Sequence, residues 1–211
     1  MAYDLEEQES LDELKAWWDK WGNLILTVVT VGCLAFAGYN GMKWYERNQA
    51  AEAAVAYASL QDSLAHQAEV AAVMQITDAM IDKDASSVYA GLGALNTAAY
   101  CLHKGDTDAA VKYLTWVVEK ADRQEFDTVA RVRLASLLID QKQYERAQVV
   151  LNEAKPTAKD QALVLDRKGD LALAMGQTQQ ARTAWEEALT LPMDSSLNSF
   201  VQLKLQALPQ Q

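Results

Sequence analysis

A run of 22 residues without a single charge, from Trp21 to Met42, constrains this chain more than any other feature of its sequence. Lys20 and Lys43 bound the run. A helix needs roughly 20 such residues to cross a hydrocarbon core about 30 Å thick. The run therefore predicts one transmembrane helix over residues 21–42. Amphipathic rings, which favour membrane interfaces, lie at both ends of it: Trp17, Trp18, Trp21, Tyr39, Trp44 and Tyr45.

A buried core helix and a cleaved signal peptide are the alternatives to a retained span. Aromatic clusters at both ends argue against a core helix. A signal peptide begins with a basic region, but the leader before this run carries seven acids and two bases, a net charge of −5. The run is also longer than the usual apolar region of a signal peptide. We therefore expect the span to stay in the membrane.

The charges beside the span do not fix its orientation. Lys15 and Lys20 precede it, and Lys43 and Arg47 follow it, so the count of basic residues on the two sides is tied. A folded domain can cross a membrane largely regardless of its charge. Both topologies therefore remain open from charge alone.

Two stripes are predicted near the membrane, one in the acidic tail of residues 1–20 and one in the span. If the tail is helical, its large apolar residues share one face, although a solvated tail with only its last turn helical is an equal alternative. In the span, small residues recur every four positions, and such a face allows another helix to approach closely. The tail stripe is Leu11, Leu14, Trp17, Trp18 and Trp21, and the small face is Cys33, Ala37 and Gly41.

Residues 43–85 contain neither proline nor glycine and are rich in alanine, which favours helix. We expect one or two long helices here, either a connector or a first helical hairpin. Ser86 or Ser87 is the expected N-cap of the next helix.

Residues 86–211 repeat a pattern of small, turn and large positions. Aligning Ala110, Ala147 and Ala181 gives spacings of 37 and 34 residues. Each alanine has a small residue twelve positions earlier, a turn residue between, and a large apolar residue four positions later. The three sets are Ala98, Ala135 and Gly169, then Gly105, Lys142 and Gly176, then Leu114, Leu151 and Trp185.

This pattern is typical of tetratricopeptide repeats, in which two antiparallel helices, A and B, form a unit of about 34 residues. Small residues let helices A and B cross closely. The final stripe Leu197, Val201, Leu205 and Leu208 predicts the capping helix that a solenoid needs. The expected fold is all-α, with one N-terminal transmembrane helix followed by a tetratricopeptide-like helical-hairpin solenoid.

Composition and motifs exclude several functions. Twenty-nine acids against 19 bases and a pI near 4.7 argue against binding to nucleic-acid phosphates. Two cysteines cannot build a disulfide framework or a four-thiolate zinc site, and we expect Cys101 to be a buried small apolar residue. There is no glycine-rich phosphate loop, nucleophile elbow or His-Glu-x-x-His. We therefore expect no catalytic residues, no cofactor and no metal.

Solenoids of helix pairs bind extended peptides or partner helices on the concave surface formed by their A helices. The mixture of apolar and acidic residues on this surface suggests a partner segment with hydrophobic anchors and some basic character. The predicted groove residues are Leu92, Leu95, Ala99 and His103, then Val129, Val132, Ser136 and Asp140, then Leu163, Asp166, Asp170 and Ala174.

Three segments resemble the YfgM family of bacterial inner-membrane proteins. They are the acidic leader, Glu6-Glu7-Gln8-Glu9, with the Trp17-Trp18 pair that follows it, the segment Leu165-Asp166-Arg167-Lys168-Gly169-Asp170, and the ending Leu203–Leu208. Trp21 stands before Gly22 where that family more usually has Asn. The resemblance implies an ancillary subunit of the SecYEG translocon, with its amino terminus in the cytoplasm and its repeats in the periplasm. It also implies the periplasmic chaperone PpiD, and nascent secreted polypeptides, as partners.

Two other hypotheses about the function remain beside this resemblance. One is a membrane-anchored scaffold of another envelope machine, such as cytochrome c maturation or pilus assembly. Another is a regulatory adaptor with its repeats in the cytoplasm, which topology alone would separate.

Overall fold

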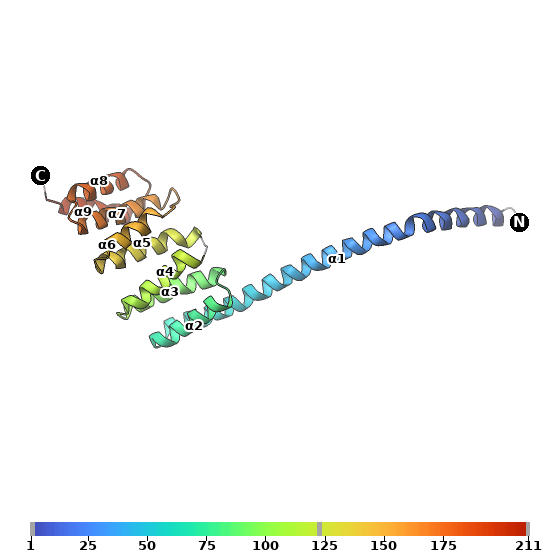
Figure 1. Cartoon of the computed structure of the whole chain (residues 1–211), viewed down its shortest axis with the longest axis horizontal. Coiled ribbons are helices and arrows are strands. Elements are labelled where there is room, and N and C mark those ends of the chain that lie inside the picture. Colours follow the sequence, from blue (N-terminus) through green and yellow to red (C-terminus); the bar gives the residue numbers. More distant parts are fainter. Residues whose placement is uncertain (1–2, 122–123, 210–211) are drawn as a thin grey trace. The chain divides into compact units, whose positions relative to one another are not determined.

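The computed structural model describes the backbone of residues 3–121 and 124–209, and the side chains of residues 10–121 and 124–209. Residues 1–2, 122–123 and 210–211 lie outside this description. So do the side chains of the acidic leader segment, Glu6 to Glu9. Every regular element in the described part is an α-helix, which confirms the all-α prediction (Figure 1). The helices are α1 (Tyr3–Ala65), α2 (Val70–Lys83), α3 (Val88–His103), α4 (Thr107–Lys120), α5 (Gln124–Asp140), α6 (Tyr144–Asn152), α7 (Gln161–Ala174), α8 (Thr178–Leu189) and α9 (Ser195–Ala207).

The chain divides into two compact units, residues 1–52 and 53–211, which are described separately. In the first unit, α1 is helical from Tyr3, so the helical alternative for the acidic tail is confirmed. The helix is long and apolar enough to cross a membrane. Leu34 and Phe36 are 68% and 72% exposed, as expected for side chains that face lipid rather than protein.

Two polar side chains within the span, Thr27 and Asn40, donate hydrogen bonds to the helix backbone. The Thr27 hydroxyl donates to the Asn23 carbonyl at 2.7 Å, and the Asn40 amide donates to the Phe36 carbonyl at 2.9 Å. A buried polar group without a partner is costly in a hydrocarbon environment, so these bonds reduce the cost of placing both residues near the membrane. The bounding Lys43 lies with its ammonium group 4.6 Å from the ring centroid of Tyr39.

The second unit contains the three predicted helical hairpins, α3–α4, α5–α6 and α7–α8, stacked in chain order (Figure 1). Two residues after the end of each A helix, the predicted turn residue has a left-handed backbone: φ is 87° at Gly105, 58° at Lys142 and 78° at Gly176. The same pair of backbone hydrogen bonds closes each end. At Gly105, for example, its own N–H donates to the Leu102 carbonyl and the next N–H donates to the Cys101 carbonyl. This is the Schellman arrangement, which satisfies the last carbonyl groups of a helix.

The small and large positions of the repeat are buried as predicted. Leu114, Leu151 and Trp185 are 3%, 1% and 1% exposed. At the tightest crossing, a Cβ atom on Gly169 would lie 2.5 Å from Cδ1 of Trp185. The indole N–H of Trp185 donates to the Asp166 carbonyl at 3.0 Å. Glycine is therefore required at position 169 because a tryptophan packs directly over it.

Residues 53–83 form an earlier hairpin, from the end of α1 and from α2. Gln67 has the left-handed backbone of the later turns, with φ of 53°, and the Ala68 N–H donates to the Ser63 carbonyl at 2.9 Å. Seven residues before Gln67 stands the fully buried Leu60, where the other repeats have Ala98, Ala135 and Gly169 at that distance from the turn. Because a leucine stands there, α1 and α2 do not cross as closely as the two helices of each later hairpin. The next hairpin begins with Ser87 as its N-cap, as predicted, and its hydroxyl accepts from the Tyr89 N–H.

Helix α9 covers the last hairpin, as predicted for a capping helix. Val201 and Leu208 are buried against Trp185 and its neighbours. The Asp194 carboxylate caps the helix by accepting from the Leu197 N–H at 2.8 Å. Hydrogen bonds from the Ser196 hydroxyl and from this backbone amide lower the pKa of Asp194.

Candidate functional site

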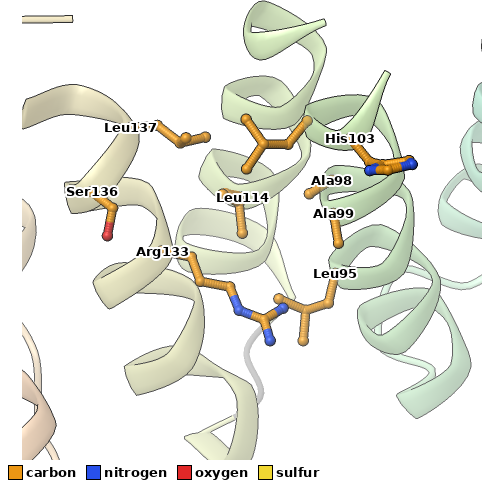
Figure 2. A pocket seen from close by; sticks show the side chains of 9 residues that line it. Leu95, Ala98, Ala99, His103, Leu114, Arg133, Ser136 and Leu137 are labelled. Atoms are coloured by element: carbon orange, nitrogen blue, oxygen red, sulfur yellow. The ribbon is translucent and has the colours of Figure 1, made fainter. Parts of the chain in front are cut away.

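An apolar pocket of about 470 Å³ opens between α3, α4 and α5 (Figure 2). Ligand pockets in proteins typically measure roughly 300–1,000 Å³, so this one has room for several side chains of a partner. It is lined by Leu95, Ala98, Ala99, Leu102 and His103 of α3, Leu114 of α4, and Arg133, Ser136 and Leu137 of α5.

The packing of neighbouring helices explains why the pocket is open here. Near the start of α3 and α5, Phe126 packs so closely on Gly91 that a Cβ atom there would lie 2.7 Å from its ring. Beyond this contact the two helices are held apart, and Leu114 of α4 lies between them. The backbones of α5 and α7 approach each other directly, so the A helices of the next two repeats leave less room.

The polar groups of the pocket are few, and none of the lining residues is acidic. The Arg133 side chain extends from α5 towards Leu95 on α3 (Figure 2). It is exposed, and it has no hydrogen bond or ion pair with any residue in the described part of the chain. The Ser136 hydroxyl donates to the Val132 carbonyl at 2.9 Å, so its proton is already engaged. The exposed His103 stands at the opposite end from Leu95.

Four of the twelve predicted groove residues lie together in this pocket: Leu95, Ala99, His103 and Ser136. Four others from the same two helices do not line it. Leu92 and Val129 are half-buried and Asp140 is exposed. Val132 is only 4% exposed and packs in the core away from the pocket lining, so its contact with a partner stays a prediction.

Two of the three acidic residues predicted for the groove, Asp166 and Asp170, are used inside the protein, which corrects that part of the prediction; the third, Asp140, is exposed. Asp166 is 2% exposed and accepts from the Lys204 ammonium of α9 at 2.7 Å. Asp170 accepts from Lys204 at 2.9 Å and from Arg167 at 2.7 Å. Burial raises the pKa of Asp170, against the effect of its hydrogen bond with Lys204. These acids hold the capping helix on α7 and are not free to attract a basic partner.

The remaining predicted positions do not extend the pocket. Leu163 packs partly buried against the main core, and Ala174 is exposed at the end of α7. Cys33, Ala37 and Gly41 are all exposed on α1 in the first unit, so a face of small residues is present, and its partner stays a prediction.

Arg133 is the main residue that the sequence reasoning missed. The predicted groove on α5 stepped from Val129 to Val132 and then to Ser136. A step of four residues from Val129 reaches Arg133 instead, on a helical face that still includes Ser136 and continues to Leu137. That alternative spacing was the available signal. It could not decide between two adjacent faces before the position of α4 was known.

The side chains that line this site are mostly apolar. Among the described residues, no three histidine, cysteine or acidic side chains come together as a metal site. Cys101 is fully buried, as predicted, and burial raises the pKa of its thiol, which disfavours the nucleophilic thiolate. An apolar hollow with one free cation at its edge can hold apolar and anionic groups of a partner.

Stacked hairpins with close crossings, left-handed turns and a capping helix define a tetratricopeptide-like repeat protein. The chain belongs to the family described as "Tetratricopeptide repeat-like domain", which matches residues 15–210.

Relatives extend this similarity to whole proteins and confirm the resemblance to the YfgM family. A protein of Neisseria gonorrhoeae is 28% identical over 210 residues, 99% of this chain and 100% of the relative. A protein of Haemophilus influenzae is 25% identical over 190 residues, 89% and 91% of the two chains. One of Escherichia coli K12 is 24% identical over 205 residues, 94% and 95% of the two. Each bears the name "Ancillary SecYEG translocon subunit", which describes no catalytic activity. No solved structure matches the chain.

Proposed function

We infer that this protein is a non-enzymatic ancillary subunit of the SecYEG translocon in the bacterial inner membrane. The observation that carries the proposal is the match of nearly the whole chain to relatives named as ancillary subunits of this translocon. The apolar anchor helix and the hairpin array with its open apolar pocket support a membrane-anchored binding subunit.

In this proposal the amino terminus lies in the cytoplasm and the repeats lie in the periplasm. The repeat unit binds the periplasmic chaperone PpiD and assists secreted polypeptides as they leave the channel. The pocket of α3, α4 and α5 supports a binding role because it exposes apolar surface that the protein does not cover itself. The small face of Cys33, Ala37 and Gly41 is the proposed contact with a translocon helix.

Site-specific photocrosslinking in living cells tests the partners. A photoreactive residue replaces Ala37 in the span, Ala99 in the pocket, or Ala174 as a matched exposed alanine outside the pocket. We expect SecY adducts from position 37, and PpiD or secreted polypeptides from position 99 but not from position 174. Adducts with cytochrome c maturation, pilus or cytoplasmic proteins would refute the proposal and favour another membrane-anchored scaffold.

Thiol labelling tests the topology. The native Cys101 is fully buried, which keeps its own labelling low. We expect a membrane-impermeant maleimide to label Ser199→Cys in intact spheroplasts and Ser10→Cys only after lysis. The reverse pattern would place the repeats in the cytoplasm and support the regulatory-adaptor alternative.

A further inference from the structure

We propose that the pocket between α3, α4 and α5 binds an amphipathic helix of another protein, with apolar side chains in the pocket and a carboxylate on Arg133. This deepens the proposed function, on which it rests, by naming the kind of segment that the repeat unit recognises.

The occupant must bring its own backbone hydrogen bonds. The walls are helices, whose main-chain groups are bonded within α3 and α5, and the lining side chains are mostly apolar. An extended strand would lose water from its N–H and C=O groups without gaining partners, which is costly for each group. The Ser136 proton is already donated to Val132. A helix satisfies its backbone internally, so it enters such a pocket at a lower cost.

The shape of the pocket also suits a helix. From Leu95 to His103 the lining of α3 spans nine residues, a rise of about 12 Å along the helix axis, which is roughly two turns. The small residues Ala98, Ala99 and Ser136 let another backbone come close. An occupant helix of two turns presents apolar side chains at spacings of three and four residues, and these reach Leu114 on the floor.

Charge complementarity selects an acidic occupant. The chain has a formal net charge of −10, yet no carboxylate lines this pocket. Arg133 at its edge is exposed, and no ion pair holds it within the described ranges. Of the three acids predicted for the groove, Asp166 and Asp170 are paired with Lys204 elsewhere in the unit, and Asp140 at the end of α5 does not line the pocket. A guanidinium group beside apolar surface matches a carboxylate that lies next to apolar side chains.

Peptide selection on the full-length chain in lipid nanodiscs tests the proposal. The probe is a phage-displayed library of random peptides of about 16 residues, roughly four helical turns. We expect the enriched peptides to carry large apolar residues at helical spacing with an adjacent Asp or Glu, and to lack central proline. Enrichment of proline-containing or acid-free sequences, or of none at all, would overturn the proposal.

Binding of the best peptide, measured by fluorescence anisotropy, then locates the site. Ala99→Trp fills the pocket from an exposed position, and we expect it to weaken binding on the order of tenfold or more, whereas Ala174→Trp leaves it unchanged. Equal binding to both variants would show that the peptide binds elsewhere and would overturn the proposal.

A charge exchange tests Arg133 itself. We expect Arg133→Glu to weaken binding by on the order of tenfold, and replacement of the peptide acid by lysine to restore it. Arg146→Glu makes the same change of net charge at another exposed arginine and should have little effect. No rescue by the exchanged peptide would overturn the carboxylate assignment. These measurements need no translocon, so a failure here is distinct from failed crosslinking to SecY.

Discussion

Replacing Gly169 with alanine should destabilise the repeat unit strongly, although alanine is the better helix former and stands at this repeat position in Ala98 and Ala135. The added Cβ atom would lie 2.5 Å from Cδ1 and 2.7 Å from Cε2 of Trp185. Carbon atoms pack at about 3.5–4.0 Å, so the indole must move by about 1 Å. That movement also breaks its 3.0 Å hydrogen bond to the Asp166 carbonyl.

The expected loss in the free energy of unfolding is about 3 kcal/mol. Overpacking costs about 2 kcal/mol, and the broken hydrogen bond with a buried donor costs about 2 kcal/mol. The higher helix propensity of alanine offsets about 1 kcal/mol. With a urea m-value of about 2 kcal/mol/M, Gly169→Ala lowers the unfolding midpoint by roughly 1.5 M.

Trp185→Leu supplies the rescue. The other two hairpins have leucine at this repeat position, at Leu114 and Leu151. Alone, Trp185→Leu should lower the free energy of unfolding by about 3 kcal/mol, because the smaller side chain leaves a void. In that background Gly169→Ala becomes neutral or stabilising by up to about 1 kcal/mol, because the clashing indole is gone. The coupling energy between the two sites should therefore exceed about 3 kcal/mol.

Urea unfolding of the full-length chain in detergent micelles, followed by far-UV circular dichroism, measures all four members of this cycle. Ala135→Gly is the matched control at the same repeat position and should cost only about 1 kcal/mol. Additive losses in the double variant, or a Gly169→Ala variant within about 0.5 kcal/mol of the parent, would refute the close crossing as the cause.

Three further outcomes are expected. Gly105→Ala should cost about 1 kcal/mol in urea unfolding and Lys142→Gly should gain up to about 1 kcal/mol, since both sites have positive φ; the opposite signs would contradict the turn assignment. Lys204→Met should cost about 3 kcal/mol by leaving Asp166 buried and unpaired, and an unchanged midpoint would show that the pair is dispensable. The lowered pKa of Asp194 makes its N-cap stabilising above the unfolded-state value near 3.8, and this contribution is lost as pH falls through the folded pKa. NMR titration of the capped amide should therefore have a midpoint below 3.8, and a midpoint at or above it would contradict the cap.

The hairpins were predictable because their local geometry restricts which residue types can stand at certain positions. A close helix crossing demands a small residue, as at Ala98 and Ala135, and a left-handed helix end favours glycine, as at Gly105. The earlier hairpin was predicted only as one of two alternatives, because Leu60 is not a small residue and Gln67 is not a glycine.

The site was predictable only in part because its chemistry depends on distant pairing. The position of Asp166 on its helix predicts a groove residue. Nothing in the local spacing indicates that Lys204, 38 residues later, neutralises it. Arg133 becomes a pocket residue only because α4 places Leu114 between α3 and α5. Periodicity identifies the faces of a helix, but it does not say which face a neighbouring helix leaves uncovered.

The ion pair between Asp166 and Lys204 has a consequence for the order in which the chain can reach its final state. A chain is synthesised from its amino terminus, so α7 exists before the residue that neutralises its buried acid. Until α9 is complete, Asp166 has no cation from that helix and the indole of Trp185 lacks its cover of Val201. The third repeat therefore matures last, and truncation before position 204 should leave α7 and α8 susceptible to proteolysis while the preceding hairpins stay folded.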